Sequence, residues 1–397
     1  MNVNICNPYQ HVNWDTFTPH RTELHCHTSA SDGKTNFADM IEAYYAAGYD
    51  CLAISDHGTI DKSWTKPRWN FINRFLQGEP RNGFRLSGLT EERLREITEG
   101  IDRDGRGMLR VPFGTEHSCG GRKLTDVNSW FCDVRSVGWG CAGYRKAVRR
   151  VQQAGGLCVI NHPTTSALNH MHPYHEIYEK DTVYVDEVQQ LLAQHPALLG
   201  IDCVEAEDRK LWDILLQRLA PQRNVFNVAA GDEHDAEDLK HSCIVGYTWA
   251  MMPENTVENL RTCLQQGAFF AASTYIAFVF TKELHAAHPG LLAALREESP
   301  KSAHVFHIDN PDLYTHTCFI PRPIDAPQPT IKRITVTNST ITLEAENCDA
   351  VLWISNGKII CAGDAINLAN CPNLGAYVRA ELWGPGGNLY TQPFLLQ

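Results

Sequence analysis

Five stretches of this sequence contain histidine, four of them together with aspartate or glutamate, and these are side chains that bind divalent metal ions in proteins. Side chains two residues apart on a strand point to the same side, so His25 and His27 can face one ion, as can Asp232 and His234. A carboxylate such as Glu116 can bridge two ions and reduce their repulsion. The stretches are His25-Cys26-His27 with Asp32, Asp56-His57, Glu116-His117, Asn161-His162-Pro163 and Asp232-Glu233-His234.

The elements that must position these residues are short apolar segments, each of which we expect to form a strand. They cover residues 52–55, 109–113, 157–160, 201–204 and 225–229. In parallel α/β folds the C-terminal ends of the strands lie at one edge of the sheet and build the active site. One HxH or Asp-His pair could be a solvated surface feature. Its repetition at successive strand ends favours a shared metal site over that reading.

Between the expected strands, apolar residues recur at helical spacing. Phe37, Met40, Ile41 and Tyr44 form one such face. Further helices are expected over residues 90–99, 144–153, 185–193, 210–219 and 256–266. This alternation predicts an α/β fold with a parallel sheet and helices outside it, either as a barrel or as an open sheet.

A change of composition divides the chain. Residues 1–320 hold the histidine-rich stretches, and the polar segment 65–107 within them is predicted to be an insertion over the active-site face. Residues 321–329 are rich in proline and predict a stiff linker. Residues 330–397 contain no histidine and are predicted to form a small β-sandwich, with a hairpin at Asn356-Gly357 and a second turn at 384–387.

Length and charge limit the function further. The chain has 397 residues, 43% of them hydrophobic, which is enough for a sizeable core. Its formal net charge of −11 argues against nucleic acid as a partner. No apolar run is long enough to cross a membrane, and the N-terminal residues do not resemble a secretory signal. The 14 cysteines are scattered without a CxxC pair, which predicts reduced thiols in a cytoplasmic protein.

The set of motifs resembles the PHP (polymerase and histidinol phosphatase) superfamily, and more closely its CehA/McbA-like metallohydrolase branch. Residues 266–273, 377–381 and 390–393 are also similar to that branch, so the resemblance covers most of the chain outside residues 65–107. It implies a distorted (β/α)7 barrel of the PHP type over residues 1–320, followed by the small C-terminal β-sandwich.

The resemblance also implies how the ligands are shared among divalent ions, whose identity could be Zn, Mn or Fe. A third ion is expected to bind less firmly, because members with three ions usually offer another histidine between the positions that match Glu116 and His162. Here that interval holds only His117, which faces the other way on a strand. The implied sets are His25, His27, Glu116 and Asp232 for the first ion, Asp32, His57 and His234 for the second, and Glu116 and His162 for the third.

This centre would suit a metal-dependent hydrolase, most simply a phosphoesterase acting on a small phosphorylated metabolite through a metal-bridged hydroxide. Lys62 is a candidate for binding the phosphate, and Arg135 and Arg145 are others. His117 could donate a proton to the leaving group, or it could be a buried histidine bonded to Glu116. Two alternatives stay open: hydrolysis of a carbamate or amide by the same centre, and a non-catalytic metal-binding protein. No nucleic-acid or membrane partner is expected, and the chain could form a homo-oligomer.

Overall fold

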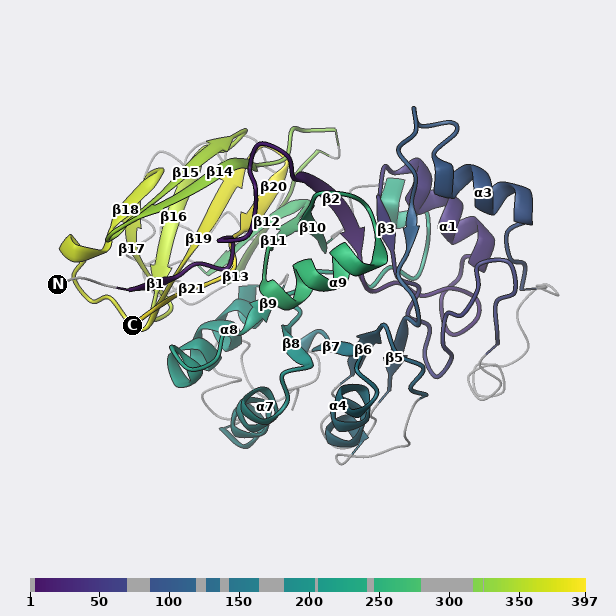
Figure 1. Ribbon diagram of the computed structural model, residues 1–397, viewed down its shortest axis with the longest axis horizontal. Helices are drawn as coiled ribbons and strands as arrows, with labels where there is room; N and C mark the ends of the chain where they lie inside the picture. Colours follow the sequence, from purple (N-terminus) through teal and green to yellow (C-terminus); the bar gives the residue numbers. More distant parts are fainter. Residues whose placement is uncertain are drawn as a thin grey trace.

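The computed structural model describes residues 4–69, 86–118, 126–135, 143–163, 182–203, 206–240, 246–279, 317–323 and 325–397. Within them it shows a mixed α/β fold. Strands fill the centre and one end of the molecule, and helices cover the lower and right-hand sides in the view of Figure 1. In the part of the chain that is described, no helix is both long and apolar enough to span a membrane.

Two sets of strands carry the histidine-rich segments. In the first set, β2 (Thr18–Glu23), β3 (Cys51–Leu52) and β4 (Leu109–Arg110) run parallel to one another. The second is a five-stranded sheet in which β7, β8 and β9 are parallel, as predicted. Its strands are β5 (Thr115–His117), β6 (Val127–Trp130), β7 (Leu157–Ile160), β8 (Leu198–Ile201) and β9 (Phe226–Asn227).

The expected parallel sheet is confirmed only in part, because β10 (Gly246–Met252) runs antiparallel to β2 and the second set contains an antiparallel strand that was not predicted. β6 runs antiparallel to both of its neighbours, β5 and β7. The first residue of β6 therefore lies at the edge where the neighbouring strands end. This reversal brings residues just before β6, such as Asp126, to the same edge as His162, which follows β7.

Hydrogen bonds link the two sets of strands on both sides. Beyond β3, the amide of Glu116 donates to the Ser55 carbonyl at 2.9 Å, and His57 and Glu116 form a parallel bridge. Beyond β9, the amide of Asp232 donates to the His25 carbonyl at 2.9 Å. These links hold the ends of β2, β3, β5 and β9 side by side at one edge.

Two predicted strand boundaries differ from the structure. Of the expected strand 109–113, only residues 109–110 form a strand, β4, because Pro112 lacks an amide donor and Phe113 has a positive φ of 62°; β5 begins after this break, at Thr115. Glu116 therefore lies inside a strand of its own. The strand expected at 201–204 is β8, which ends at Ile201, so that Asp202 follows the strand end.

Helices overlap all six predicted positions. Two of them begin with a threonine cap: Thr90 Oγ1 accepts a hydrogen bond from the Arg93 amide, and Thr256 Oγ1 accepts one from the Asn259 amide. The same two helices end at glycines with left-handed φ angles. The helices are α1 (Phe37–Ala46), α3 (Glu91–Glu99), α4 (Gly143–Gln153), α7 (Thr182–Gln194), α8 (Ala206–Leu219) and α9 (Val257–Gln266), with short 3₁₀ turns at Asp238–Lys240 and Leu368–Asn370.

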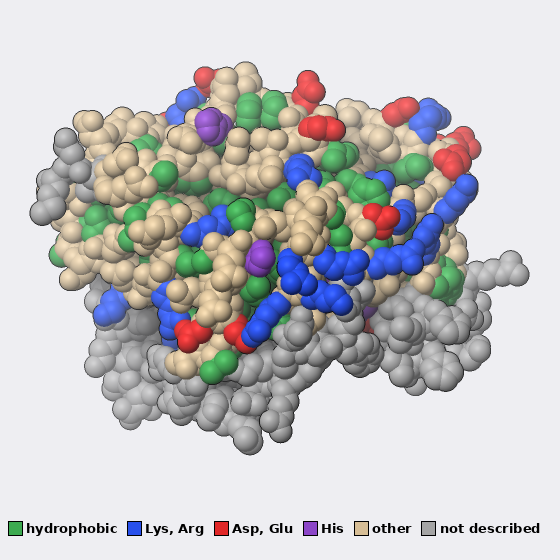
Figure 2. Space-filling model, turned by 60° about the horizontal axis from the view of Figure 1, so that its bottom comes forward, with side chains coloured by type: hydrophobic (Ala, Val, Ile, Leu, Met, Phe, Trp, Pro, Cys, Tyr) green, Lys and Arg blue, Asp and Glu red, His purple; other side chains and the backbone are tan. Residues whose placement is uncertain are grey.

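Helix α4 shows how the sequence pattern places a helix against the sheet. Its apolar residues Tyr144, Ala147, Val148 and Val151 are three or four residues apart and are all buried. The opposite side of α4 is basic and exposed. Figure 2, which turns the lower side of Figure 1 toward the reader, shows Lys and Arg side chains gathered near the centre and right of that face. Four of the exposed basic residues of α4 are Arg145, Lys146, Arg149 and Arg150.

The C-terminal strands form two groups. β14 (Thr330–Thr337), β15 (Thr340–Glu346) and β18 (Ala365–Asn367) make a three-stranded sheet. The other C-terminal strands continue the large sheet, because β20 pairs with β11 and β10 pairs with β2. These strands are β16 (Ala350–Ser355), β17 (Lys358–Ala362), β19 (Tyr377–Gly384), β20 (Gly387–Tyr390) and β21 (Phe394–Leu396).

Three strands from earlier in the chain belong to the same sheet: β1 (Ile5–Cys6), β10 (Gly246–Met252) and β11 (Phe269–Ser273). A separate two-stranded sheet is formed by β12 (Tyr275–Val279) and β13 (Thr317–Pro321).

Both predicted C-terminal turns are confirmed. β16 and β17 are antiparallel around Asn356 and Gly357, which have φ angles of 52° and 70°. β19 and β20 are antiparallel around residues 385–386. The division into a barrel, a linker and a separate sandwich stays a prediction, and the shared sheet shows that the C-terminal strands are bonded to the rest of the fold.

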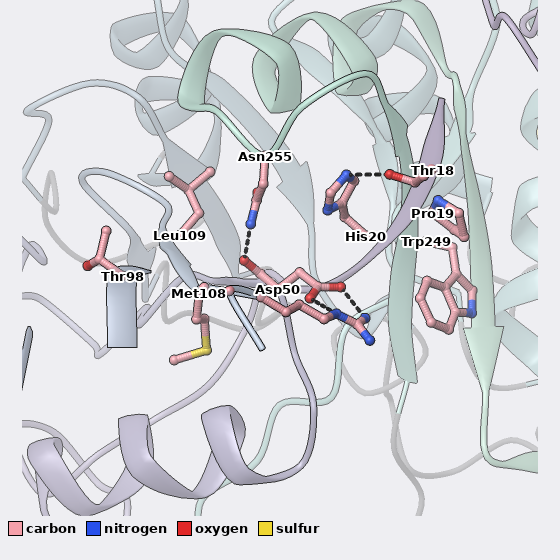
Figure 3. A pocket seen from close by; sticks show the side chains of 12 residues that line it. Thr18, Pro19, His20, Asp50, Thr98, Met108, Leu109, Trp249 and Asn255 are labelled. Atoms are coloured by element: carbon pink, nitrogen blue, oxygen red, sulfur yellow. Dashed lines mark hydrogen bonds and ion pairs between the residues drawn. The ribbon is translucent and has the colours of Figure 1, made fainter. Parts of the chain in front are cut away.

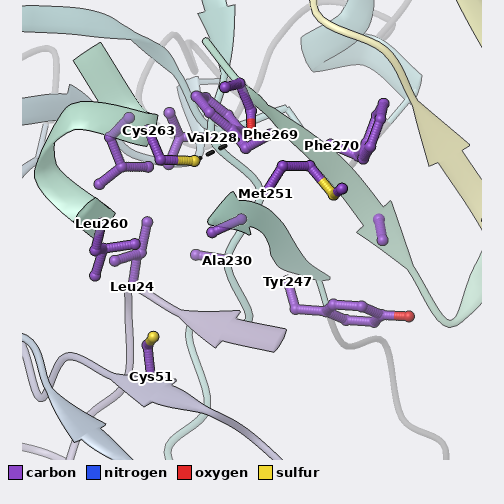
Figure 4. Packing of buried hydrophobic residues seen from close by; sticks show 14 of the residues in the cluster. Leu24, Cys51, Val228, Ala230, Tyr247, Met251, Leu260, Cys263, Phe269 and Phe270 are labelled. Carbon is purple, nitrogen blue, oxygen red and sulfur yellow. Dashed lines mark hydrogen bonds between the residues drawn. The ribbon is translucent and has the colours of Figure 1, made fainter. Parts of the chain in front are cut away.

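The core follows this shared sheet. α9 covers the face of β10 and β11, where Leu260 and Cys263 of the helix lie near Met251 and Phe269 of the strands (Figure 4). Leu24, at the end of β2, belongs to the same cluster. Burial of these side chains removes a large apolar area from water and fixes the strands beneath the histidine-rich edge.

Side chains complete the outer edge of β9. The amide of Asn227 donates to Gln392 Oε1 at 2.9 Å, and Gln392 Nε2 donates to the Asn227 carbonyl at 2.9 Å. Thr248 Oγ1 donates to the Ala229 carbonyl at 2.9 Å. A glutamine from the C-terminal segment thus supplies the bonds that a neighbouring strand would otherwise make.

Buried ion pairs join α8 to β19. Arg379 is 2% exposed and donates from Nε and Nη2 to the two oxygens of Asp213, at 2.9 and 2.7 Å. Its Nη1 donates to Glu381 Oε1 at 2.6 Å, and its guanidinium lies over the ring of Trp212. These charged side chains are buried together, so each of them depends on the opposite charge of its partners to offset the cost of leaving water.

Helix α3 connects the parallel strands β3 and β4, which is the ordinary place of a crossover helix. The segment predicted as an insertion over the active-site face is therefore in part a regular connection. Residues 70–85 of that segment lie outside the described residues. Thr98, Arg106, Asp50, His20 and Trp249 line a cavity of about 680 Å³ at the beginning of these strands (Figure 3). That cavity is at the opposite end of β2 and β3 from His25 and His57.

Candidate metal centre

Four of the predicted ligands converge at the ends of β2, β5 and β9. The Nε2 atoms of His25 and His27 lie 3.0 Å apart. Glu116 Oε2 lies 3.1 Å from His25 Nε2 and 3.0 Å from His27 Nε2. Asp232 Oδ1 lies 3.0 and 3.1 Å from the same two nitrogens. These four residues are the set that the resemblance implied for the first ion.

The spacing of these atoms suits a divalent cation. Ligands held about 2.0–2.2 Å from an ion stand roughly 3.0–3.4 Å apart when the angles between them are near-octahedral or tetrahedral. If both facing nitrogens carry protons, two positive imidazoles lie 3.0 Å apart and repel each other, which a single bound cation avoids. Asp232 Oδ1 is moreover buried without a hydrogen-bond partner among the described residues. The residues present therefore fit a metal ion at this position.

The electrostatics point the same way. Burial lowers the pKa of His25, but Asp232 and Glu116 outweigh burial and raise that pKa well above its usual value. Burial raises the pKa of Glu116, but the positive charges of His25 and His57 bring it well below the usual value. The pocket thus attracts positive charge strongly, and a bound cation can take the place of the imidazole protons.

A second group of ligands lies beside the first. Asp32 Oδ1 is 3.3 Å from His27 Nδ1, and Asp32 Oδ2 is 3.4 Å from His57 Nε2. His234 Nε2 lies 3.5 Å from Asp32 Oδ2, and its ring stacks on His27 with centroids 4.3 Å apart. Asp32, His57 and His234 therefore come together, as the resemblance implied for the second ion, with His27 between the two groups.

A third group contains a residue that the sequence analysis missed. Glu116, His162 and Asp126 offer ligand atoms within 4.8 Å of one another. His162 Nε2 is 3.4 Å from Glu116 Oε1. Asp126 precedes β6, and because β6 is antiparallel, its beginning meets the end of β7. Asp126 thus stands where a further histidine was expected, and it was missed because β6 and its direction were not predicted from the sequence.

Two of these residues adopt unusual backbone conformations. His162 has a φ of 26° and Asp232 a φ of 56°, in the left-handed region that residues other than glycine rarely adopt. His162 is also followed by Pro163, which further restricts its backbone. Conformations of this kind cost of order 1–3 kcal/mol and are concentrated at functional sites. The fold therefore maintains strain at two proposed ligands.

Asp56 fixes the loop that carries Asp32. Its Oδ1 accepts hydrogen bonds from the Thr28 amide at 2.7 Å and from Ser31 Oγ at 2.6 Å, and its Oδ2 accepts one from Thr28 Oγ1 at 2.7 Å. Gly33 closes the loop, because a Cβ there would lie 2.7 Å from the backbone of His27. Asp56 therefore positions Asp32, a proposed ligand of the second group, by holding the loop that carries it.

We expect Asp56→Ala to lower the free energy of unfolding by about 2–4 kcal/mol, because three buried donors lose their acceptor. It should also weaken the binding of the second ion, since the loop that carries Asp32 loses its anchor. Chemical denaturation and titration with Mn²⁺ measure the two effects. Asp39→Ala, on the exposed side of α1, is the control. Unchanged metal binding in Asp56→Ala would contradict this role.

Lys62 and His117, the two residues predicted to act on the substrate, lie in different surroundings. Lys62 pairs with Asp133 and lines a small cavity together with Asp56 and Arg68, next to the loop that follows His57. His117 is fully buried and points to the face of β5 opposite to Glu116, with Nε2 2.9 Å from Ser129 Oγ. Burial lowers the pKa of His117 to about 4. Its role as a proton donor stays a prediction.

Other expectations meet the structure only in part. Arg145 pairs with Glu187 on the outer side of α4 and α7. The segment 119–143, where loops could shape the pocket, is described only over residues 126–135 and at residue 143. Ser118 was not predicted, and its Oγ lies 2.6 Å from His57 Nδ1, which leaves His57 Nε2 directed at Asp32.

Comparison with known proteins gives distant likenesses. No family model and no curated protein matches the chain. A two-domain protein from Bacteroides vulgatus that contains a predicted PHP-like metal-dependent phosphoesterase is 14% identical, with a TM-score of 0.44 over 100% of this chain and 98% of that one. An amidohydrolase from Chromobacterium violaceum, with bound sulfate and no metal, is 14% identical, with a TM-score of 0.33 over 54% of this chain and 87% of that one. Likenesses at this level assign neither a family nor a function to this chain.

Proposed function

We propose that this protein is a metal-dependent hydrolase and that it acts on a phosphate ester of a small molecule. The observation that carries the proposal is the sharing of ligands: Glu116 belongs to the first and third groups, and His27 to the first and second. Adjoining ions held in this way suit the clamping of a phosphate, because the attacking and leaving oxygens both need positive charge beside them.

Bound divalent ions would supply a hydroxide near neutral pH and would withdraw charge from the phosphate oxygens. The chain's own residues then position the reaction. Asn161 Nδ2 donates to Glu116 Oε1 at 2.7 Å and fixes the shared carboxylate. Lys62, which pairs with Asp133 and lies in the loop after His57, is the proposed cation for a phosphate oxygen.

We further propose that the centre holds two firmly bound ions and a third bound by Glu116, Asp126 and His162. Zn, Mn and Fe all suit mixed imidazole and carboxylate ligands. Membership of the PHP superfamily and a distorted (β/α)7 barrel belong to the same proposal. The hydrogen bonds that link β3 to β5, and the segment after β9 to the end of β2, support the barrel.

The rival function is hydrolysis of a carbamate or amide by the same centre. Such a substrate needs the hydroxide and one Lewis-acidic ion but no cation beside the metals. Lys62, in the loop that follows His57, is the proposed cation, and loss of phosphoester turnover in Lys62→Ala would favour the phosphate ester over this rival. A metal-binding protein without catalysis is the more remote alternative, and it gives no reason for the strained backbone at His162 and Asp232.

The test is a substrate screen on protein stripped with a chelator and reloaded with Mn²⁺, Zn²⁺ or Fe²⁺. We expect turnover of phosphomonoesters or phosphodiesters that disappears on stripping and returns on reloading. His57→Ala should reduce both the metal content and this turnover, since it removes a ligand of the second group. Turnover of carbamates or amides alone would sink the phosphoesterase proposal, and firm metal binding without any turnover would favour the non-catalytic alternative.

A further inference from the structure

One buried carboxylate joins the two chain segments that carry the first group of ligands. Glu23 is the last residue of β2 and is fully buried. Its Oε1 accepts hydrogen bonds from the amides of Leu24 and His25, at 2.9 and 2.8 Å. The same oxygen accepts a third hydrogen bond, at 3.0 Å, from the amide of Gly231, which precedes Asp232. Glu23 therefore holds the backbone at His25 and directly before Asp232.

Backbone hydrogen bonds continue the junction between these two segments. The Asp232 amide donates to the His25 carbonyl at 2.9 Å, and the His27 amide donates to the Glu233 carbonyl at 2.8 Å. Asp232 itself has a left-handed φ of 56°. A residue in this conformation does not continue a strand, so the direction of its side chain depends on how the residues beside it are held. The hydrogen bond from the Gly231 amide to Glu23 holds one of them.

The surroundings of the junction are tightly packed. A Cβ at residue 231 would lie 1.8 Å from Glu233 Oε2. That carboxylate is buried and held in place, since the Tyr44 hydroxyl donates to its Oε2 at 2.6 Å. On the side of β3, the Ala53 amide donates to the backbone carbonyl of Glu23 at 2.9 Å. Close packing of this kind resists a change in the spacing of the two segments when an ion binds.

We propose that Glu23 is a positioning residue that sets the spacing of two ligands of the first ion and thereby favours small divalent ions there over larger ones. His25 Nε2 and Asp232 Oδ1 lie 3.0 Å apart. This spacing suits ligand atoms about 2.0–2.2 Å from an ion, whereas a larger ion needs its ligands farther apart. Glu23 would not touch the ion. The proposal rests on the metal binding that underlies the proposed function.

The experiment is a calorimetric titration of metal-free protein with Co²⁺ and with the larger Cd²⁺, together with the visible spectrum of bound Co²⁺. The binding step that His25→Ala loses identifies the first position. At that step we expect Glu23→Ala to bind Co²⁺ about 10- to 100-fold more weakly. Binding of Cd²⁺ should fall by less than about tenfold, because a loosened site can widen around it. The ratio of Cd²⁺ to Co²⁺ affinity therefore rises, which a general loss of stability would not produce.

Glu23→Gln is the conservative variant. Its amide oxygen can accept the same three hydrogen bonds from backbone amides that Glu23 Oε1 accepts. We therefore expect Glu23→Gln to keep the wild-type ratio of affinities and the wild-type Co²⁺ spectrum. If it resembled Glu23→Ala instead, the charge of Glu23 rather than its hydrogen bonds would support the site, and the proposal would be wrong.

Asp50→Ala is the matched control. Asp50 is 1% exposed, and its Oδ2 accepts hydrogen bonds from the Arg21 amide at 2.8 Å and from Arg106 Nη2 at 2.7 Å. It thus also binds the backbone of β2, but at the end opposite to His25. Asp50→Ala should lower the free energy of unfolding without changing the Co²⁺ spectrum or the ratio of affinities.

Each outcome decides the proposal. Wild-type affinities in Glu23→Ala would overturn it, and so would an equal fall for Co²⁺ and Cd²⁺. If Glu23→Ala does not fold, Glu23→Asp decides, because it keeps the charge but is one methylene too short to hold the Gly231 amide in place. An unchanged ratio in Glu23→Asp would then refute the role. Wild-type protein that binds Co²⁺ but hydrolyses no phosphoester would refute only the proposed function, whereas the absence of metal binding would remove both.

Discussion

Replacing Glu116 by glutamine is expected to abolish metal-dependent activity, with a fall of about a thousandfold or more, because several kcal/mol of charge stabilisation depend on bound ions. One carboxylate meets four imidazoles here. Its Oε2 lies 3.1, 3.0 and 3.4 Å from His25, His27 and His57, and its Oε1 lies 3.4 Å from His162. Glutamine keeps the volume and an acceptor for Asn161 but loses the charge.

The measurement is metal content after dialysis, together with turnover of whichever phosphoester the wild type hydrolyses. Glu116→Gln should retain at most one ion, bound by the second group of ligands. Glu258→Gln, an exposed change in the first turn of α9, is the control for the loss of one negative charge. A Glu116→Gln protein that keeps all its ions would show that the shared carboxylate does not hold the centre together.

The largest expected effect on stability comes from Arg379→Ala. Removing one member of a buried ion pair leaves its partners charged and uncompensated, which typically costs about 3–5 kcal/mol. Asp213 would lose two hydrogen bonds and Glu381 one. Unfolding in urea should therefore show a loss of this size, and the junction between α8 and β19 should open first.

Arg333→Ala is the comparison that separates the effect of burying an ion pair from the effect of its charge alone. Arg333 also contacts two carboxylates, Asp15 and Glu344, but its side chain is 39% exposed. Exposed pairs contribute about 0–1 kcal/mol because water screens them. If Arg379→Ala lowered the free energy of unfolding by no more than Arg333→Ala does, the buried network would stabilise the fold no more than an exposed ion pair.

The sequence analysis succeeded where the information was local. His25 and His27 are two residues apart on one chain segment and face the same group of ligands, as their spacing predicted. The same spacing did not place Asp232 and His234 together, because Asp232 has a left-handed φ of 56° and lies outside a strand. The helices could be predicted equally well from local sequence, because buried residues recur at helical spacing, as in α4. Which strand ends meet one another depended only on the assumption that all strands are parallel.

That assumption also explains what was missed. Asp126 comes before its strand rather than after it, and only the reversal of β6 brings it to the metal edge. Strand direction depends on pairing between distant segments, which one sequence does not show. The sharing of one sheet through β11 and β20 is likewise a long-range pairing.

The side-chain bonds at the edge of β9 have a consequence for how the protein is made. A ribosome adds Gln392 only after a further 165 positions beyond Asn227. Until then, the strand that leads to Asp232 presents an open edge, which is a template for pairing with other chains. The nascent protein should therefore depend on chaperones until Gln392 has been made. Its metal centre should mature only once Gln392 has been made and docks against β9.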